Sequence, residues 1–176
     1  MVWYLPTLNT IILYNMKLLA LFVSILLFVS ADLADVRQKY LSAPKSAEVT
    51  EELYASLKDV SDSSSDNTMV AYKAAALTLR AKHEKGLLTK KKLFTQGAKL
   101  LEAVIKRDAD NYEARLLRLS IQENAPKITG YNKMITEDKA FLIKNYKVQK
   151  QDLKEYTLGF VKVSSSFNKD EKAAFN

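Results

Sequence analysis

Apolar side chains recur every three or four positions over much of the chain, which is the spacing that places them on one face of an α-helix. Lysine, glutamine and glutamate take the opposite face in the clearest example, residues 89–107. No segment keeps the alternation of period two that indicates a half-buried β-strand. The pattern therefore predicts an all-α protein, with Leu101, at the centre of the 89–107 stripe, buried. The stripe itself consists of Leu93, Phe94, Gly97, Leu100, Leu101, Val104 and Ile105.

The same reasoning predicts about seven short helices, joined by short turns and packed antiparallel in sequence-adjacent pairs. The helix expected after the polar tract 61–67 is rich in alanine, whose small side chains allow neighbouring helices to approach closely. The charged tail, residues 168–176, is expected to fray. The seven expected ranges are 32–41, 46–60, 68–83, 89–107, 111–124, 135–146 and 150–167.

Capping residues precede two of these helices. Asp66 or Asn67 is positioned to accept a hydrogen bond from the first turn of the 68–83 helix. Asp110 and Glu113 have the Asp-x-x-Glu spacing of a capping box before the 111–124 helix. These residues predict where the two helices begin.

A stretch near the N-terminus has the order of a secretory signal peptide. Lys17 supplies a basic start, residues 18–29 an apolar core, and Val29-Ser30-Ala31 a small-x-small cleavage pattern. We therefore expect translation to start at Met16, with residues 1–15 an upstream extension from an over-long gene prediction. Residues 16–31 would be the signal, and residues 32–176 a single helical domain.

An uncleaved membrane anchor is the alternative interpretation of this stretch. Residues 11–29 form one apolar stretch broken only by Asn15 and Lys17, and it is just long enough to span a bilayer. Lys17 would then lie within the span, where a charge is costly, whereas it is expected at the start of a signal. The protein would touch a membrane only if this segment were retained.

The expected export of the protein bears on how its lack of cysteine and its positive net charge are interpreted. The 176 residues include no cysteine and carry a net charge of +7, so the domain must be stabilised by its core without disulfides. Exported proteins without disulfides are common in the bacterial envelope, which favours a periplasmic or secreted bacterial protein. Nucleic acid is not expected as a partner there. The basic residues are interpreted as solvated helix faces, with anionic lipid headgroups or acidic polysaccharide as the alternative.

The sequence predicts no catalytic, cofactor-binding or metal-binding residue. His83 is the one histidine, and its place at the end of a helix favours the helix dipole. Without cysteine, the usual thiolate zinc sites and Cys–His catalysis are excluded. The four glycines are isolated, so no phosphate-binding loop is present. We therefore expect a protein that is not an enzyme, with an enzyme of unrecognised class as the alternative.

Residues 97–114 resemble part of a tetratricopeptide repeat, a family of helical hairpins that stack into solenoids. Gly97, Leu101 and Val104 match the small, large and third packing positions of the second helix of a repeat. Residues 110–114 resemble the turn between repeats, although Ala109 replaces the usual proline. The resemblance covers about one and a half repeats. It implies an α-solenoid fragment whose concave face binds an extended peptide or a partner protein.

Together these features predict an exported, non-enzymatic protein- or peptide-binding module, with a membrane-tethered structural protein as the alternative. In a repeat-like stack, the 68–83 and 111–124 helices would line the groove. Tyr72, Arg115 and Arg118 would then be its exposed contacts. Arginine pairs with carboxylates through two parallel hydrogen bonds, so an acidic or C-terminal peptide is the expected ligand.

Tyrosines occur about once per expected helix or turn. They either line the edge of the core with their hydroxyl groups reaching water, or converge on one groove as recognition contacts. The six that raise this question are Tyr54, Tyr72, Tyr112, Tyr131, Tyr146 and Tyr156.

Overall fold

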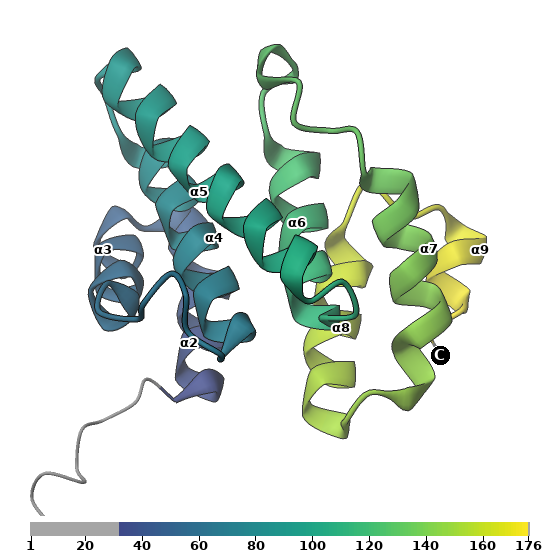
Figure 1. Ribbon diagram of the computed structural model, residues 1–176. Coiled ribbons are helices and arrows are strands. Elements are labelled where there is room, and N and C mark those ends of the chain that lie inside the picture. The colour runs from purple at the N-terminus through teal and green to yellow at the C-terminus, as the bar shows by residue number, and fades with distance from the viewer. Residues whose placement is uncertain (1–31, 176) are drawn as a thin grey trace, which may run out of the picture. The chain divides into compact units, whose positions relative to one another are not determined.

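The computed structural model describes residues 32–175, and these residues form helices without any β-strand (Figure 1). The all-α prediction is confirmed, and all seven expected helices are present at nearly the expected positions. The α-helices are α2 (Leu33–Ser42), α3 (Ala47–Leu57), α4 (Asn67–His83), α5 (Leu87–Arg107), α6 (Tyr112–Asn124), α7 (Ile135–Asn145), α8 (Gln151–Val163) and α9 (Lys169–Ala173). Short 3-10 helices follow three of them: η1 (Ala43–Lys45), η2 (Lys127–Thr129) and η3 (Tyr146–Val148).

The unit from Leu33 to Asn176 is compact and has a core of its own. A chain that starts at Asp32 therefore contains every packing contact described below. The predicted signal peptide, upstream extension and anchor lie outside the described residues. Within the described residues, no helix combines the length and the apolar character needed to cross a bilayer.

Local capping explains where two of the helices begin, with one correction to the sequence prediction. Asp66 caps α4 as expected, because its carboxylate accepts a hydrogen bond of 3.0 Å from the Met69 amide. The capping box at Asp110 and Glu113 is wrong. Asn111 caps α6 instead, and Glu113 turns into the protein interior, where it has an ion-pair partner.

Helix α4 is the centre of the N-terminal half, in contact with α2, α3, α5 and α6. Its alanines at positions 71, 74, 75, 76 and 81 are all buried, which confirms the prediction of close helix packing. Gly97 of α5 lies directly against α4. A Cβ atom there would stand 2.5 Å from the Ala74 carbonyl oxygen and 2.7 Å from the Thr78 methyl group.

The residues that carry the repeat resemblance lie in this closely packed hairpin. Gly97, Leu101 and Val104 are buried, and Asn111 starts the next helix. Any tightly packed pair of helices has such positions, so the tetratricopeptide relationship stays a prediction, whereas the burial of Leu101 is confirmed.

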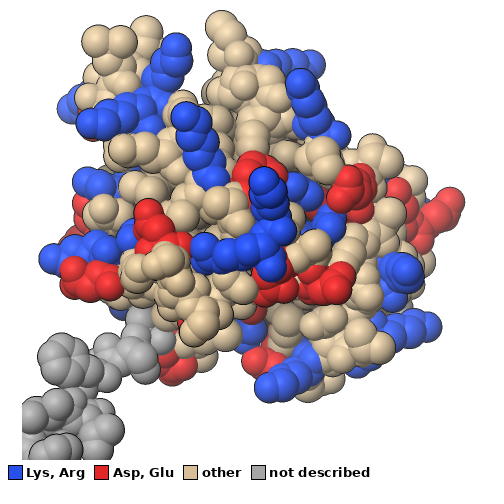
Figure 2. Space-filling view, viewed as in Figure 1, with Lys and Arg blue, Asp and Glu red and all other residues tan. Residues whose placement is uncertain are grey.

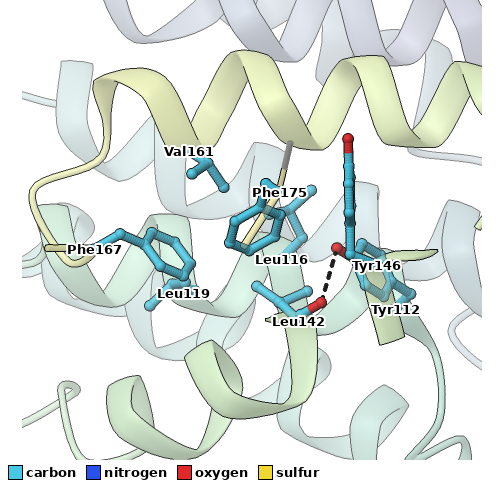
Figure 3. Close-up of a cluster of buried hydrophobic side chains, with 8 residues drawn as sticks. All are labelled: Tyr112, Leu116, Leu119, Leu142, Tyr146, Val161, Phe167 and Phe175. Atoms are coloured by element: carbon cyan, nitrogen blue, oxygen red, sulfur yellow. Dashed lines mark hydrogen bonds between the residues drawn. The ribbon is translucent and has the colours of Figure 1, made fainter. Parts of the chain in front are cut away.

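The C-terminal half has its own apolar cluster, built from α6, α7, α8 and the chain that follows them (Figure 3). Phe167 and Phe175 meet edge to face, with ring centroids 5.3 Å apart, and Phe175 also packs on Tyr146. The prediction that the 168–176 tail frays is wrong. Asn168 and Glu171 form a capping box that starts α9, and this helix holds Phe175 in the core.

Two glycine substitutions test the close approach of α5 to α4. Alanine is the better helix former by about 1 kcal/mol in a helix interior. Gly159→Ala in α8 should gain about 0.5–1 kcal/mol in the free energy of unfolding, because the added Cβ meets nothing within 4 Å. Gly97→Ala should instead lose about 1–3 kcal/mol, because the added methyl group overpacks the interface. Denaturant melts measure both changes, and a Gly97→Ala protein as stable as Gly159→Ala would show that α4 and α5 have room between them.

Candidate functional site

Tyr72, expected as an exposed contact, is completely buried. Its hydroxyl group donates a hydrogen bond of 2.6 Å to the Glu113 carboxylate of α6, so α4 and α6 touch where a groove was expected. The ring of Tyr40 packs edge-on against the Tyr72 ring, with centroids 5.8 Å apart. The prediction that Tyr72 is exposed is wrong, because the alanine-rich face of α4 brings α2 and α6 close around it.

Tyr72 belongs to a polar group, the Arg37 cluster, formed by the buried Arg37, Tyr72 and Glu113 together with the exposed Asp152. Arg37 of α2 donates two parallel hydrogen bonds to Glu113, of 2.7 and 2.9 Å, and a third of 2.7 Å to Asp152 of α8. The hydrogen bond from Arg37 lowers the pKa of Asp152. Burial raises the pKa of Tyr72 well above its ordinary value, so its phenol stays protonated and donates to Glu113. The cluster joins α2, α4, α6 and α8.

Arg118 and Arg115 lie in a second group, the Arg118 cluster, with Asp138, Glu102 and Tyr131. Arg118 donates two hydrogen bonds of 2.7 Å to Asp138 and one of 2.9 Å to Glu102. Arg115 reaches Asp138 at 3.2 Å, and Tyr131 donates to Glu102 at 2.7 Å. Burial raises the pKa of the Asp138 carboxyl, and the two guanidinium groups oppose that rise.

The prediction that Arg115 and Arg118 are exposed is also wrong. The side chain of Arg118 is almost entirely buried, and that of Arg115 is only 12 % exposed. Arg115 also stacks on Phe141 and pairs with Glu137. Both side chains are committed to carboxylates on α5 and α7, of which Asp138 is buried, Glu102 is half-buried and Glu137 is exposed.

The carboxylates of Glu113 and Asp138 line neither of the two depressions that stand out on the described surface. Their polar atoms are paired within the clusters. We interpret both clusters as structural joints between helices.

The tyrosines do not converge on one groove. Four of the seven within the described residues are buried: Tyr40, Tyr72, Tyr112 and Tyr146. Most hydroxyl groups have partners inside the protein, such as Ser120 for Tyr40 and the Leu142 carbonyl for Tyr112 (Figure 3). These tyrosines therefore pack in the core or donate hydrogen bonds within the polar clusters.

The larger depression lies over α4, between α3 and α5, and has a volume of about 550 Å³. We call it the α4 groove. Lys73 and Leu77 of α4 form its floor, with one wall from α3 and the loop after it and the other from α5. The wall residues are Tyr54 and Asp62 on one side and Gln96, Lys99 and Leu100 on the other.

Apolar and polar groups share the α4 groove. Tyr54, Leu77 and Leu100 are each half-buried, so the groove offers apolar surface to a ligand. Lys73 is already committed, because its ammonium group lies 2.8 Å from the Asp62 carboxylate and 2.7 Å from the Val60 carbonyl oxygen. Lys99 is exposed at the wall. The unengaged charge of the groove is therefore positive.

The sequence analysis missed these residues. Leu77 follows Lys73 by one helical turn, and Leu100 lies at the edge of the apolar stripe of α5, next to Lys99. These spacings are visible in the sequence, but nothing local indicates that the two surfaces face the same space.

The second depression is a small pocket of about 90 Å³ between α2, α6 and α8. Tyr40, Leu116 and Phe160 are among its walls, and Ser120 is its one small polar side chain. Ligand sites usually measure about 300–1,000 Å³, so this pocket is too small for one and fits only a single side chain or a few waters. The α4 groove is the better candidate site.

Comparison of the chain with protein-family models, with curated proteins and with solved structures gives no match. The case for function therefore depends on the groove and the surface.

Breaking the Arg37 cluster should substantially lower the free energy of unfolding of the protein. Arg37→Met leaves the Glu113 carboxylate buried without its cationic partner, which should cost about 3–5 kcal/mol in the free energy of unfolding. Lys39→Met in the same helix removes an exposed pair with Asp35, of 2.7 Å, and should cost less than about 1 kcal/mol. Denaturant melts compare the two variants, and equal losses would contradict a special role for the buried pair.

The buried tyrosines predict a loss of stability in alkali. Burial raises the pKa of Tyr40 to about 12, and it also raises the pKa of Tyr72, Tyr112, Tyr131 and Tyr156. Tyrosine in an unfolded chain titrates near about 10. Above that pH the unfolded chain therefore loses protons that the native state keeps, and the native state is destabilised.

The free energy of unfolding should then fall by up to about 1.4 kcal/mol per pH unit for each such tyrosine. Denaturant melts at about pH 9 and about pH 11 measure the fall, and phenolate absorbance should rise together with unfolding. Tyr40→Phe, which removes one of the titrating groups, should make the fall shallower. A free energy that is the same at both pH values would refute this account.

Proposed function

We propose that this protein is a non-enzymatic interaction module of the bacterial envelope, exported through its N-terminal signal, and that the α4 groove binds a segment of a partner protein. The observation that carries the proposal is the groove itself, with the half-buried Tyr54, Leu77 and Leu100 and the exposed Lys99 in its lining. Helical proteins commonly bind peptide segments in such grooves.

The form of the groove supports a chain segment as its ligand. Its volume of about 550 Å³ is within the range of known ligand sites. It is open to solvent, whereas sites for small molecules enclose most of the ligand surface. A peptide lying along α4 could place apolar side chains on Tyr54, Leu77 and Leu100 while its backbone stays in water.

The charge of the groove supports an acidic segment. Lys73 is neutralised by Asp62, and Lys99 is left to pair with a carboxylate of the ligand. Asp62 is the one carboxylate in the groove lining, and its lysine partner holds it. Because general acid–base chemistry needs a positioned donor and acceptor, this lining supports binding over catalysis.

Selection from a phage-displayed peptide library against the chain from Asp32 to Asn176 tests the proposal. We expect enriched peptides that combine acidic and apolar residues. Lys99→Glu should weaken the binding of a selected peptide by about tenfold, as expected for the loss of a charged contact at an interface. Fluorescence anisotropy of the labelled peptide measures the dissociation constant.

Lys106→Glu is the matched control, because it changes the same charge on an exposed part of the same helix, outside the groove. It should leave the dissociation constant nearly unchanged. Equal weakening by both variants would mean that the peptides respond only to net charge. Peptides that bind Lys99→Glu as well as the original protein would rule out the groove.

A further inference from the structure

Large exposed apolar side chains gather at one end of the helical unit, around the start of α5. Leu87 and Leu88 are adjacent in the first turn of α5 and are 78 % and 84 % exposed. Leu41, Ile128 and Val163 are exposed at the ends of neighbouring elements, whereas Val148, the remaining exposed large apolar residue among those described, follows α7.

Figure 1 shows the start of α5 and the loop after α6 projecting at the same end of the helical unit, and contacts between elements bring the other ends near them. The His83 ring nitrogen at the end of α4 lies 2.9 Å from the Ala43 carbonyl oxygen, just after Leu41. Phe94 of α5 packs on Tyr131, which follows η2, with ring centroids 5.7 Å apart. Ser164, beside Val163, donates a hydrogen bond of 2.6 Å to Glu123 near the end of α6.

Lysines surround the two leucines. The segment from Lys82 to Lys92, which we call the α4–α5 tip, contains five lysines and one acidic residue, Glu84. The carboxylate of Glu84 already accepts a hydrogen bond of 2.8 Å from the Gly86 amide. Figure 2 shows basic side chains over this end of the molecule and acidic ones mostly farther down. The five lysines are at positions 82, 85, 90, 91 and 92.

These residues do not serve the stability of α5. The N-terminal end of a helix carries partial positive charge, so acidic residues are favourable there and a lysine such as Lys90 is not, whereas Lys82 lies in the last turn of α4, where a cation is favourable. The first turn of α5 has no acidic residue, and its N-cap, Gly86, provides no side-chain hydrogen bond. Two adjacent leucines in water add a second unfavourable feature. Departures from local stability rules of this kind are expected at functional positions.

We propose that the α4–α5 tip docks on the surface of an anionic lipid bilayer. Leu87 and Leu88 insert at the boundary between headgroups and acyl chains, and the surrounding lysines pair with lipid phosphates. Ile128 and Lys127 of η2 provide a second contact at the same end. This docking surface is separate from the α4 groove and does not depend on it.

A bilayer fits this surface better than a protein does. Protein interfaces centre on side chains that fill pockets, but here the apolar side chains project from the end of a helical hairpin. Neither leucine lines either of the two depressions described above. A soluble acidic polymer would satisfy the lysines and leave the leucines in water.

Vesicle co-sedimentation tests the proposal with the chain from Asp32 to Asn176, which lacks the apolar N-terminal segment. We expect this chain to sediment with vesicles of equal parts phosphatidylcholine and phosphatidylglycerol and to stay in solution with phosphatidylcholine alone. Binding should weaken as salt is added, because salt screens the lysine–phosphate attraction. No sedimentation with the anionic vesicles, or equal sedimentation with both kinds, would overturn the proposal.

Two variants separate the apolar and the charged contributions. Leu87→Ser with Leu88→Ser should lower the vesicle partition coefficient by about tenfold or more, since two apolar insertions are lost. Lys91→Glu with Lys92→Glu should lower it similarly. Lys91 and Lys92 are exposed in the second turn of α5, so reversing their charge should leave the fold intact.

Matched controls change the same residue types outside the tip. Val148→Ser, and Lys147→Glu with Lys150→Glu, alter exposed residues between α7 and α8 and should leave vesicle binding unchanged. Equal losses in these controls would overturn the proposal. A different pattern would also overturn the proposal: the protein binds both dextran sulfate and anionic vesicles, the lysine variant loses this binding and the leucine variant keeps it. That pattern would identify a soluble acidic polymer as the ligand class.

Discussion

The buried pair of Arg37 and Glu113 is the constraint on which the arrangement of the helices depends. A charge removed from water is costly unless a partner of opposite sign and further hydrogen bonds satisfy it. Glu113 meets this condition only when α2 supplies Arg37 and α4 supplies Tyr72. Arg37 then reaches Asp152, so α8 is held by the same cluster. We regard the pair as a device for specifying this arrangement of helices, because an apolar pair of similar volume would contribute as much or more to stability.

The ion pairs of the interior decide which surfaces are free to act. Arg115 and Arg118 would be attractive clamps for a carboxylate on an exposed helix, but Asp138, Glu102 and Glu137 already occupy them. Among the basic groups left in solvent are lysines at the wall of the α4 groove and at the α4–α5 tip. One surface is hollow with half-buried apolar walls, and the other projects with fully exposed leucines. These shapes favour different partners, a chain segment for the groove and a lipid surface for the tip.

Close packing and polar satisfaction are linked in α4. Its alanines and Gly97 of α5 let the helices approach until a single added methyl group would collide with the Ala74 carbonyl oxygen. That approach excludes water from the neighbourhood of Tyr72, and burial then keeps its phenol protonated as a donor to Glu113. At the other end of the chain, the capping box of Asn168 and Glu171 starts a helix of only five residues, and Phe175 holds it by packing on Tyr146 and Phe167.

The sequence by itself determined the helices, the Asp66 cap and the burial of Leu101, because these depend on residues within a few positions of one another. Only the tertiary structure decided the fate of Tyr72, Arg118 and Glu113, which local patterns placed on a solvent-facing side or at a helix cap. Arg37 and Glu113 stand 76 residues apart, and no spacing rule links them. The α4 groove likewise exists only because α3 and α5 pack on the same side of α4. Helical periodicity is a property of short segments, whereas the burial of a charge depends on which distant segment meets it.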